Sequence, residues 1–215
     1  MSPPQARSQK RASSHFSGAF MATDSWLVVG LGNPGPDYSH NRHNVGQMVL
    51  DVLGARLGGK FKSHKAHAAV LEGRLGLGGP RLVLAKPLTF MNLTGGPVNA
   101  LCRFYDIPAE RVIAVHDEID IDFNTVRLKT GGGEGGHNGL RDISKALGTK
   151  DYLRVRVGVG RPPGRQDAAD HVLRDFSSVE KKELAFLLED AADAVESLIV
   201  EGLVSAQQKF HSTGK

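Results

Sequence analysis

From residue 25 onward, hydrophobic and polar positions follow two different periods along the chain. Mostly apolar runs, and runs that alternate at every second position, predict β-strands at 26–32, 68–75, 82–85, 111–117, 125–129 and 152–160. Apolar residues spaced three and four apart predict helices at 43–58, 96–106, 137–148 and 178–209. The two neighbouring strands between 68 and 85 indicate a hairpin. The pattern therefore favours an α/β protein with a mixed sheet.

Length and composition set the expected domain organisation. The chain has 215 residues, of which 40% are hydrophobic and 23% are charged, as in one soluble globular domain. We predict a single-domain, three-layer α/β/α fold over residues 23–211. Residues 1–22 are rich in Ser, Gln, Pro and basic residues and lack an apolar signal-peptide core, so we predict a disordered extension. Their composition resembles an organelle transit peptide, but an upstream start codon or an added leader explains it equally well and is preferred.

Cysteine usage and the length of the apolar runs indicate where the protein works. Cys102 is the single cysteine, so no intrachain disulfide can form, which fits a reducing compartment and a cytoplasmic location. Because Cys102 lies in the predicted helix 96–106, we expect a buried small hydrophobe rather than a nucleophile. No run approaches the roughly 20 apolar residues that a membrane-spanning helix needs.

The formal net charge of +4 is unevenly distributed. Residues 127–165 hold nine basic and three acidic residues, whereas residues 166–203 hold three basic and ten acidic ones. This division suggests one basic face for an anionic partner and one solvated acidic face. Two ordinary amphipathic surfaces would give the same counts.

A G-x-G-x-x-G pattern at Gly30, Gly32 and Gly35 follows the first predicted strand. In a dinucleotide site the third glycine opens a helix, because the pyrophosphate binds at the N-terminus of that helix. Here the helical pattern starts only near Asn44, nine residues after Gly35. We therefore expect these glycines to allow a tight turn that holds Asn33 at the carboxyl edge of the sheet.

Polar side chains that could perform chemistry follow the ends of the predicted strands, where an α/β sheet places its ligand sites. They are Asn33, His43, Asn92, Asp117, His137 and Asn138. A histidine can take a proton from water, and a carboxylate on its other ring nitrogen orients it. His43 with Asp117 is the preferred pair, with water as the nucleophile. The alternative is that His43 only caps a helix and Asp117 only ends a strand. No Cys or His spacing suits a zinc site.

Basic side chains recur in pairs on three consecutive predicted elements. The pairs are Arg127 with Lys129, Arg141 with Lys145, and Arg154 with Arg156. Three such pairs, with a glycine-rich loop at 131–136 that brings backbone amides near an anion, favour contact with a phosphate backbone. Aromatic residues make up only 6% of the chain, so a folded A-form backbone is a better partner than stacked single-stranded bases.

Several stretches together resemble the bacterial peptidyl-tRNA hydrolases. They are "VVGLGNPGPDYSHNRHNVG", "LAKPLTFMNLTGGPV", "VHDEIDI" and "RLKTGGGEGGHNGLRDI", followed by "YLRVRVGVGRP". Their order and spacing fit from Trp26 to the C-terminal helix. The resemblance implies a twisted mixed sheet in one α/β domain, no cofactor or metal, and a monomer. It also implies hydrolysis of the ester that joins a peptide to the 3′ ribose of tRNA, which recycles tRNA from aborted translation.

The resemblance also implies a role for each matched residue. His43 is the general base and Asp117 orients it, while Asn33 and Asn92 position the attacked carbonyl and Asn92 stabilises the oxyanion. Tyr38, Met91, Asn138 and His137 belong to the same groove, with Tyr38 near the tRNA 3′ end. Arg127, Lys129 and Arg156 match positions that hold phosphates of the tRNA acceptor stem. Sparing of tRNA with a free amino acid is explained if backbone contacts would leave a charged amino group unpaired.

Two residues depart from the family pattern, and two other functions stay open. Glu134 puts an acid into the glycine-rich loop, where it would weaken phosphate binding unless it faces solvent. Asn124 replaces a Pro-Gly turn, which it can do because Asn tolerates the left-handed conformation.

An RNA-binding module without hydrolysis would need neither His43 nor Asp117. A dehydrogenase would use the Gly30 loop.

Overall fold

The computed structural model describes residues 24–162 and 164–211, so the predicted extension at 1–22 lies outside the described residues. The strands are β1 Ser25–Gly30, β2 Lys62–His64, β3 Ala68–Arg74, β4 Arg81–Pro87, β5 Val112–Glu118, β6 Val126–Thr130 and β7 Leu153–Gly158. The α-helices are α1 Val45–Arg56, α2 Gly95–Tyr105, α3 Asn138–Leu147, α4 Ala168–Val172 and α5 Glu180–His211. Short 3-10 helices are η1 Arg42–Asn44, η2 Met91–Leu93 and η3 Ala109–Arg111.

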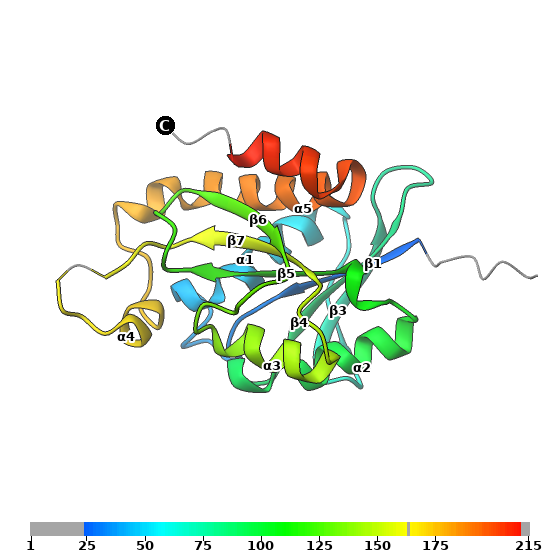
Figure 1. Cartoon of the computed structure of the whole chain (residues 1–215), viewed down its shortest axis with the longest axis horizontal. Coiled ribbons are helices and arrows are strands. Elements are labelled where there is room, and N and C mark those ends of the chain that lie inside the picture. Colours follow the sequence, from blue (N-terminus) through cyan, green and yellow to red (C-terminus); the bar gives the residue numbers. More distant parts are fainter. Residues whose placement is uncertain (1–23, 163, 212–215) are drawn as a thin grey trace, which may run out of the picture.

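The seven strands form one mixed sheet in the order β2-β3-β4-β1-β5-β7-β6. Strands β4, β1, β5 and β7 are parallel, whereas β3 pairs antiparallel with β4 and β6 pairs antiparallel with β7. The predicted hairpin is therefore β3–β4. Figure 1 shows α1 and α5 over one face of the sheet and α2 and α3 over the other. The three-layer α/β/α prediction is confirmed.

Strand periodicity builds the two cores. In β1, Val28 packs into the core on the α1 and α5 side, while Leu27 and Val29 pack into the core on the α2 and α3 side. All three side chains are fully buried, because a central parallel strand is covered on both faces. The apolar stripe of α5, including Leu187 and Val195, completes the first core.

Two elements were absent from the sequence prediction. Strand β2 is only three residues long and lies at the edge of the sheet. Helix α4 is only five residues long, too short to show a helical period. Among the described residues, no helix is long and apolar enough to cross a membrane.

The topology places the chemistry at one edge. Because β4, β1 and β5 are neighbouring parallel strands, their carboxyl ends meet at the same edge of the sheet. The connections after β1 and β4 form η1 and η2 there, and β5 ends with Asp117 and Glu118. The loop after β6 leads to the start of α3.

Candidate active site

Glycines let α1 pack directly against the central strands. A Cβ atom on Gly30 would lie 2.5 Å from the carbonyl oxygen of Gly46, and one on Gly46 would lie 2.2 Å from that of Val115. These contacts place the first turn of α1 directly on β1 and β5. The glycine pattern thus serves backbone packing, and no helix starts at Gly35, as the sequence indicated.

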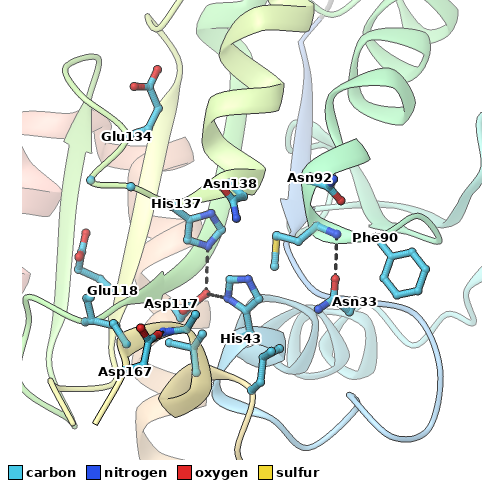
Figure 2. A pocket seen from close by; sticks show the side chains of 18 residues that line it. Asn33, His43, Phe90, Asn92, Asp117, Glu118, Glu134, His137, Asn138 and Asp167 are labelled. Atoms are coloured by element: carbon cyan, nitrogen blue, oxygen red, sulfur yellow. Dashed lines mark hydrogen bonds and ion pairs between the residues drawn. The ribbon is translucent and has the colours of Figure 1, made fainter. Parts of the chain in front are cut away.

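His43 and His137 both contact one oxygen of Asp117. His43 Nδ1 lies 2.9 Å from Asp117 Oδ1, and His137 Nε2 lies 3.0 Å from the same oxygen. Figure 2 shows the two rings on neighbouring sides of the carboxylate, one from the turn before α1 and the other from the start of α3. Asp117 is buried, so the carboxylate is held between the two rings away from solvent.

The surrounding hydrogen bonds assign the protons on these rings. His137 Nδ1 accepts from the backbone N–H of Leu140 at the start of α3, so His137 Nε2 carries the proton that it donates to Asp117. In the neutral ring, His43 donates its Nδ1 proton to the same carboxylate, which leaves His43 Nε2 unprotonated. His43 lines the pocket, so a basic nitrogen faces the space where a substrate would bind.

The pKa values follow from this pairing. Burial lowers the pKa of His43, but the charge of Asp117 and the hydrogen bond to it outweigh burial and raise it above 6.5. Burial also raises the pKa of Asp117, but His43 and His137 outweigh that effect and hold it well below the ordinary value. Asp117 is therefore a carboxylate at neutral pH.

A third histidine, His116, packs against His137. His116 is buried, its Nδ1 lies 2.7 Å from the carbonyl oxygen of Asp117, and its ring meets that of His137 edge-on at 5.0 Å. Burial, together with His137, lowers the pKa of His116 to about 3. His116 is thus a neutral packing partner for His137 at neutral pH.

Asn33 is held by hydrogen bonds from two directions. Its side-chain Oδ1 accepts from the backbone N–H of Met91 at 2.8 Å, so its Nδ2 amide is free to donate into the pocket. The Asn44 side chain brackets the Asn33 backbone: it accepts the N–H at 3.0 Å and donates to the carbonyl at 2.9 Å. Asn44 was not singled out from the sequence, because its partner is visible only in three dimensions.

A cavity of about 600 Å³ collects most of the predicted site residues. Those that line it are Asn33, His43, Met91, Asn92, Asp117, His137 and Asn138. Figure 2 shows Asn92 and Asn138 on the side of the cavity away from Asp117. Tyr38 is not among the lining residues; its ring meets Phe90, which does line the cavity, edge-on at 6.3 Å.

Part of the cavity wall was missed by sequence reasoning. The additional lining residues are Phe90, Glu118, Ile119, Glu134, Gly135, Gly136, Asp167, Ala168, Ala169, Val172 and Leu173. The α4 residues among them make one side of the cavity largely apolar. The sequence feature that could have indicated α4 is Asp167, an N-cap residue type directly before "AADHV". In the structure, Asp167 does cap α4, because its side chain accepts from the N–H of Ala169 at 2.7 Å.

The basic side chains of β6 and β7 differ in burial, which the sequence did not predict. Strand pairing sets Arg127 opposite Arg156 and Lys129 opposite Arg154, so all four share one face of the sheet. The expectation that Arg154 faces a phosphate backbone is wrong, because it is 1% exposed and donates to the carbonyl oxygens of Gly132 and Gly133. Arg154 instead fixes the glycine-rich loop.

The other three basic residues on this face, Arg127, Lys129 and Arg156, are half-buried, each with different surroundings, whereas Arg141 and Lys145 on α3 are exposed. Arg156 pairs with Glu118, and Arg127 donates to the carbonyl oxygen of Phe210 at the end of α5. Burial, together with the charges of Arg154 and Arg156, lowers the pKa of Lys129, while Glu118 and Glu134 act in the opposite direction.

The two departures from the family pattern have structural explanations. Burial raises the pKa of Glu134, but hydrogen bonds, chiefly the one from Lys150, outweigh the effect of burial and lower the pKa. In the ion pair, Lys150 Nζ lies 3.2 Å from Glu134 Oε1. The negative charge of Glu134 is therefore compensated. Asn124 has φ of 64°, in the left-handed region, as predicted for its turn.

His43, Asp117 and His137 also form a group that could ligate a metal ion, since their ligand atoms lie within 4.8 Å of one another. The protons argue for hydrogen bonding instead. A metal on His137 Nε2 would move the ring proton to Nδ1, where it would oppose the N–H of Leu140.

Comparisons with known proteins identify the family of this chain. A family model described as peptidyl-tRNA hydrolase matches residues 27–215. A peptidyl-tRNA hydrolase from Arthrobacter sp. is 74% identical over 190 residues, which cover 88% of this chain and 98% of that protein. The one from Paenarthrobacter aurescens is 75% identical over 189 residues, covering 88% of this chain and 97% of that protein.

Solved structures show the same fold. The crystal structure of peptidyl-tRNA hydrolase from Acinetobacter baumannii superposes with a TM-score of 0.79 at 35% sequence identity, covering 87% of this chain and 95% of that one. This chain belongs to the peptidyl-tRNA hydrolase family.

Proposed function

We propose that this protein hydrolyses the ester bond between the peptide and the 3′ ribose of peptidyl-tRNA, with His43 as the general base. The observation that carries the proposal is the histidine whose Nδ1 is fixed on a buried carboxylate while its Nε2 faces a cavity of about 600 Å³. The matched family supports the substrate. A dehydrogenase has no support here, because the Gly30 turn is closed by the contact with Gly46.

In the first step, His43 Nε2 takes a proton from a water molecule as the water oxygen attacks the ester carbonyl. The imidazolium that forms is stabilised by Asp117, which remains ionised. In the second step, His43 returns the proton to the ribose 3′ oxygen as the ester bond breaks. The products are the free peptide acid and tRNA with a 3′ hydroxyl.

The amides of the cavity wall would bind the attacked group. Asn92 is the preferred oxyanion donor, a contribution of roughly 3 to 4 kcal/mol to the transition state. Asn33, whose Oδ1 is occupied by Met91 N–H, can offer only its N–H₂ group to the peptide backbone. Asn138 and Met91 complete the wall, and Tyr38 would contact the tRNA 3′ end from beside Phe90.

The apolar α4 side of the cavity supports discrimination against unblocked substrate. A peptide or N-blocked amino acid presents a neutral amide to this wall. Aminoacyl-tRNA would present an ammonium group, whose desolvation against the apolar side chains of Ala168, Ala169 and Val172 is costly unless it pairs with Asp167 at the start of α4. Peptidyl-tRNA and N-blocked aminoacyl-tRNA are thus the proposed substrates.

The tRNA acceptor stem would lie across the basic face formed by β6 and β7. Arg127, Lys129 and Arg156 offer three cations on adjacent strands, close to the glycine-rich loop. One chain supplies the base, its carboxylate, the amides and the cations. We therefore propose a monomeric enzyme that needs no metal or cofactor. We also propose that the enzyme acts in the cytoplasm.

The test measures release of tRNA from N-acetyl-aminoacyl-tRNA, beside unblocked aminoacyl-tRNA, for wild type, His43→Ala and Arg127→Ala. We expect wild type to cleave only the blocked ester and His43→Ala to lose at least roughly a hundredfold in rate while still binding tRNA. Arg127→Ala should weaken binding in a salt-dependent way. Wild type that binds tRNA but cleaves neither ester would refute the proposal and favour the RNA-binding module.

A further inference from the structure

Arg42, the residue before the proposed base His43, is a buried arginine that takes no part in the proposed proton transfers. Arg42 is 6% exposed and belongs to η1, the same short turn as His43. Charged arginines are rarely buried unless they are paired, so its contacts require an explanation.

The Arg42 guanidinium reaches across to the segment between α4 and α5. Nη1 donates to the carbonyl oxygens of Arg174 at 3.2 Å and Asp175 at 2.8 Å, and Nη2 pairs with Glu180 Oε2 at 2.6 Å. The guanidinium also lies 5.4 Å from the ring centroid of Phe176, which is buried. The planar fork of arginine reaches these three acceptors from two nitrogens in a fixed geometry, which the compact ammonium group of a lysine does not reproduce.

Backbone contacts reinforce the same junction. The N–H of Arg42 donates to the carbonyl oxygen of Arg174 at 3.1 Å, and Asn41 forms an isolated antiparallel bridge with Asp175. The turn that holds His43 is therefore tied to residues 174 and 175 by both backbone and side chain.

Glu180 has a second role that keeps this junction ordered. Its Oε2 accepts the N–H of Ser177 at 2.6 Å, and the Ser177 hydroxyl accepts the N–H of Glu180 at 3.2 Å. This reciprocal pair is a capping box at the start of α5. Arg42 thus pairs with a carboxylate whose position is already set by a helix cap.

The same segment forms a wall of the cavity. Asp167, Val172 and Leu173 line the cavity, and the carbonyl groups bound by Arg42 follow directly after them. A chain of contacts therefore runs from the α4 wall through Arg42 to the turn of His43.

We infer that Arg42 is a positioning residue for the reaction: through Glu180 and the carbonyl groups of residues 174 and 175, it fixes the turn that aims His43 at the substrate. This inference rests on the proposed role of His43. Errors of about 1 Å in the placement of a reacting group can cost about a hundredfold in rate. Contacts that fix the turn of His43 should therefore have a measurable effect on kcat.

The experiment compares Arg42→Met, Arg42→Lys and Glu180→Gln with wild type, using Lys182→Met as the matched control on the exposed face of α5. The readouts are kcat and KM for N-acetyl-aminoacyl-tRNA, and the pKa of His43 by NMR titration. We expect Arg42→Met to lower kcat roughly 10- to 100-fold with little change in KM. Arg42→Lys should recover part of the loss, and Lys182→Met should match wild type.

The titration separates positioning from charge. The charged or titratable residues that line the cavity with His43 are Asp117, Glu118, Glu134, His137 and Asp167. Arg42→Met removes a positive charge and leaves Glu180 unpaired, and these changes in charge alone would raise the pKa of His43. If the turn loosens, His43 moves away from Asp117, and this movement lowers the pKa of His43. Because the inference assigns positioning to Arg42, we expect a lower pKa of His43 in Arg42→Met.

Glu180→Gln keeps the test decisive if Arg42→Met does not fold, because glutamine can still complete the capping box. We expect a smaller loss of kcat in this variant. The inference is overturned if the folded variants keep the wild-type kcat and the wild-type pKa of His43, or if only KM changes. The titration needs no turnover, so it tests this inference even if wild type cleaves no ester, a result that would refute the proposed function separately.

Discussion

His43 and His137 share a single oxygen of Asp117, at 2.9 and 3.0 Å, with their ring centroids 5.1 Å apart. The two rings are not equivalent. His137 is fixed at both nitrogens, by Asp117 and by the N–H of Leu140, whereas His43 is fixed at one and offers the other to the cavity. One carboxylate thus organises one base and one ring that is fixed at both nitrogens, and the predictions for the site follow from that difference.

Asp117→Asn should lower kcat by roughly a hundredfold to ten-thousandfold, because an amide no longer fixes the correct tautomer of His43 or stabilises the imidazolium. Since Asp117 raises the pKa of His43 above 6.5, its loss should also move the acid limb of the kcat/KM profile to lower pH. Rates measured from pH 5 to 9 check both effects. An acid limb that stays in place would show that another group controls the titration.

His137→Asn should have the opposite effect on the pH profile. Asparagine can still cap α3, but Asp117 loses one of the two hydrogen bonds that stabilise its charge. The carboxylate then interacts more strongly with protonated His43, so the pKa of His43 rises and the acid limb moves to higher pH. His43 NMR titrations in the variant and wild type provide the direct comparison; a downward shift would contradict the shared-oxygen arrangement.

Lys129→Ala should weaken tRNA binding most at low salt. Lys129 is paired in the sheet with Arg154, and the charges of Arg154 and Arg156 act on it, so a bound phosphate would displace counterions there. Loss of one phosphate contact should reduce the slope of log K against log salt by about 0.7 to 0.9. Lys62→Ala, on β2 at the opposite edge of the sheet, is the matched control and should leave the slope unchanged. Equal slopes for all three proteins would exclude Lys129 from the interface.

Gly46→Ala should destabilise the fold by about 3 kcal/mol or more, because its Cβ would meet the backbone of Val115 at 2.2 Å and of Leu31 at 2.6 Å. Gly96→Ala is the control, since a Cβ there meets nothing within 4 Å in helix α2, and it should be neutral or add up to about 1 kcal/mol. Urea unfolding of both variants checks the difference. A Gly46→Ala protein as stable as wild type would mean that α1 can move away from the sheet at little cost.

The sequence by itself predicts most of the elements, because each element has a local signal. The periods in 26–32 and 43–58 correspond to β1 and α1, and the paired strands near 68–85 correspond to the β3–β4 hairpin. The position of polar residues after parallel strands also predicts that Asn33, His43 and Asp117 meet at one edge, and they do line one cavity.

Only the tertiary structure decides what each polar side chain contacts. Arg154 and Arg156 are two residues apart on the same face of β7, yet Arg154 is buried under the glycine-rich loop whereas Arg156 is paired with Glu118 at the surface. The sharing of Asp117 by His137, the cavity wall from α4 and the contact of Arg42 with Glu180 are likewise outside local sequence. The reason is physical: periodicity sets which face of an element is apolar, but burial, hydrogen bonding and pKa depend on residues brought close from distant parts of the chain.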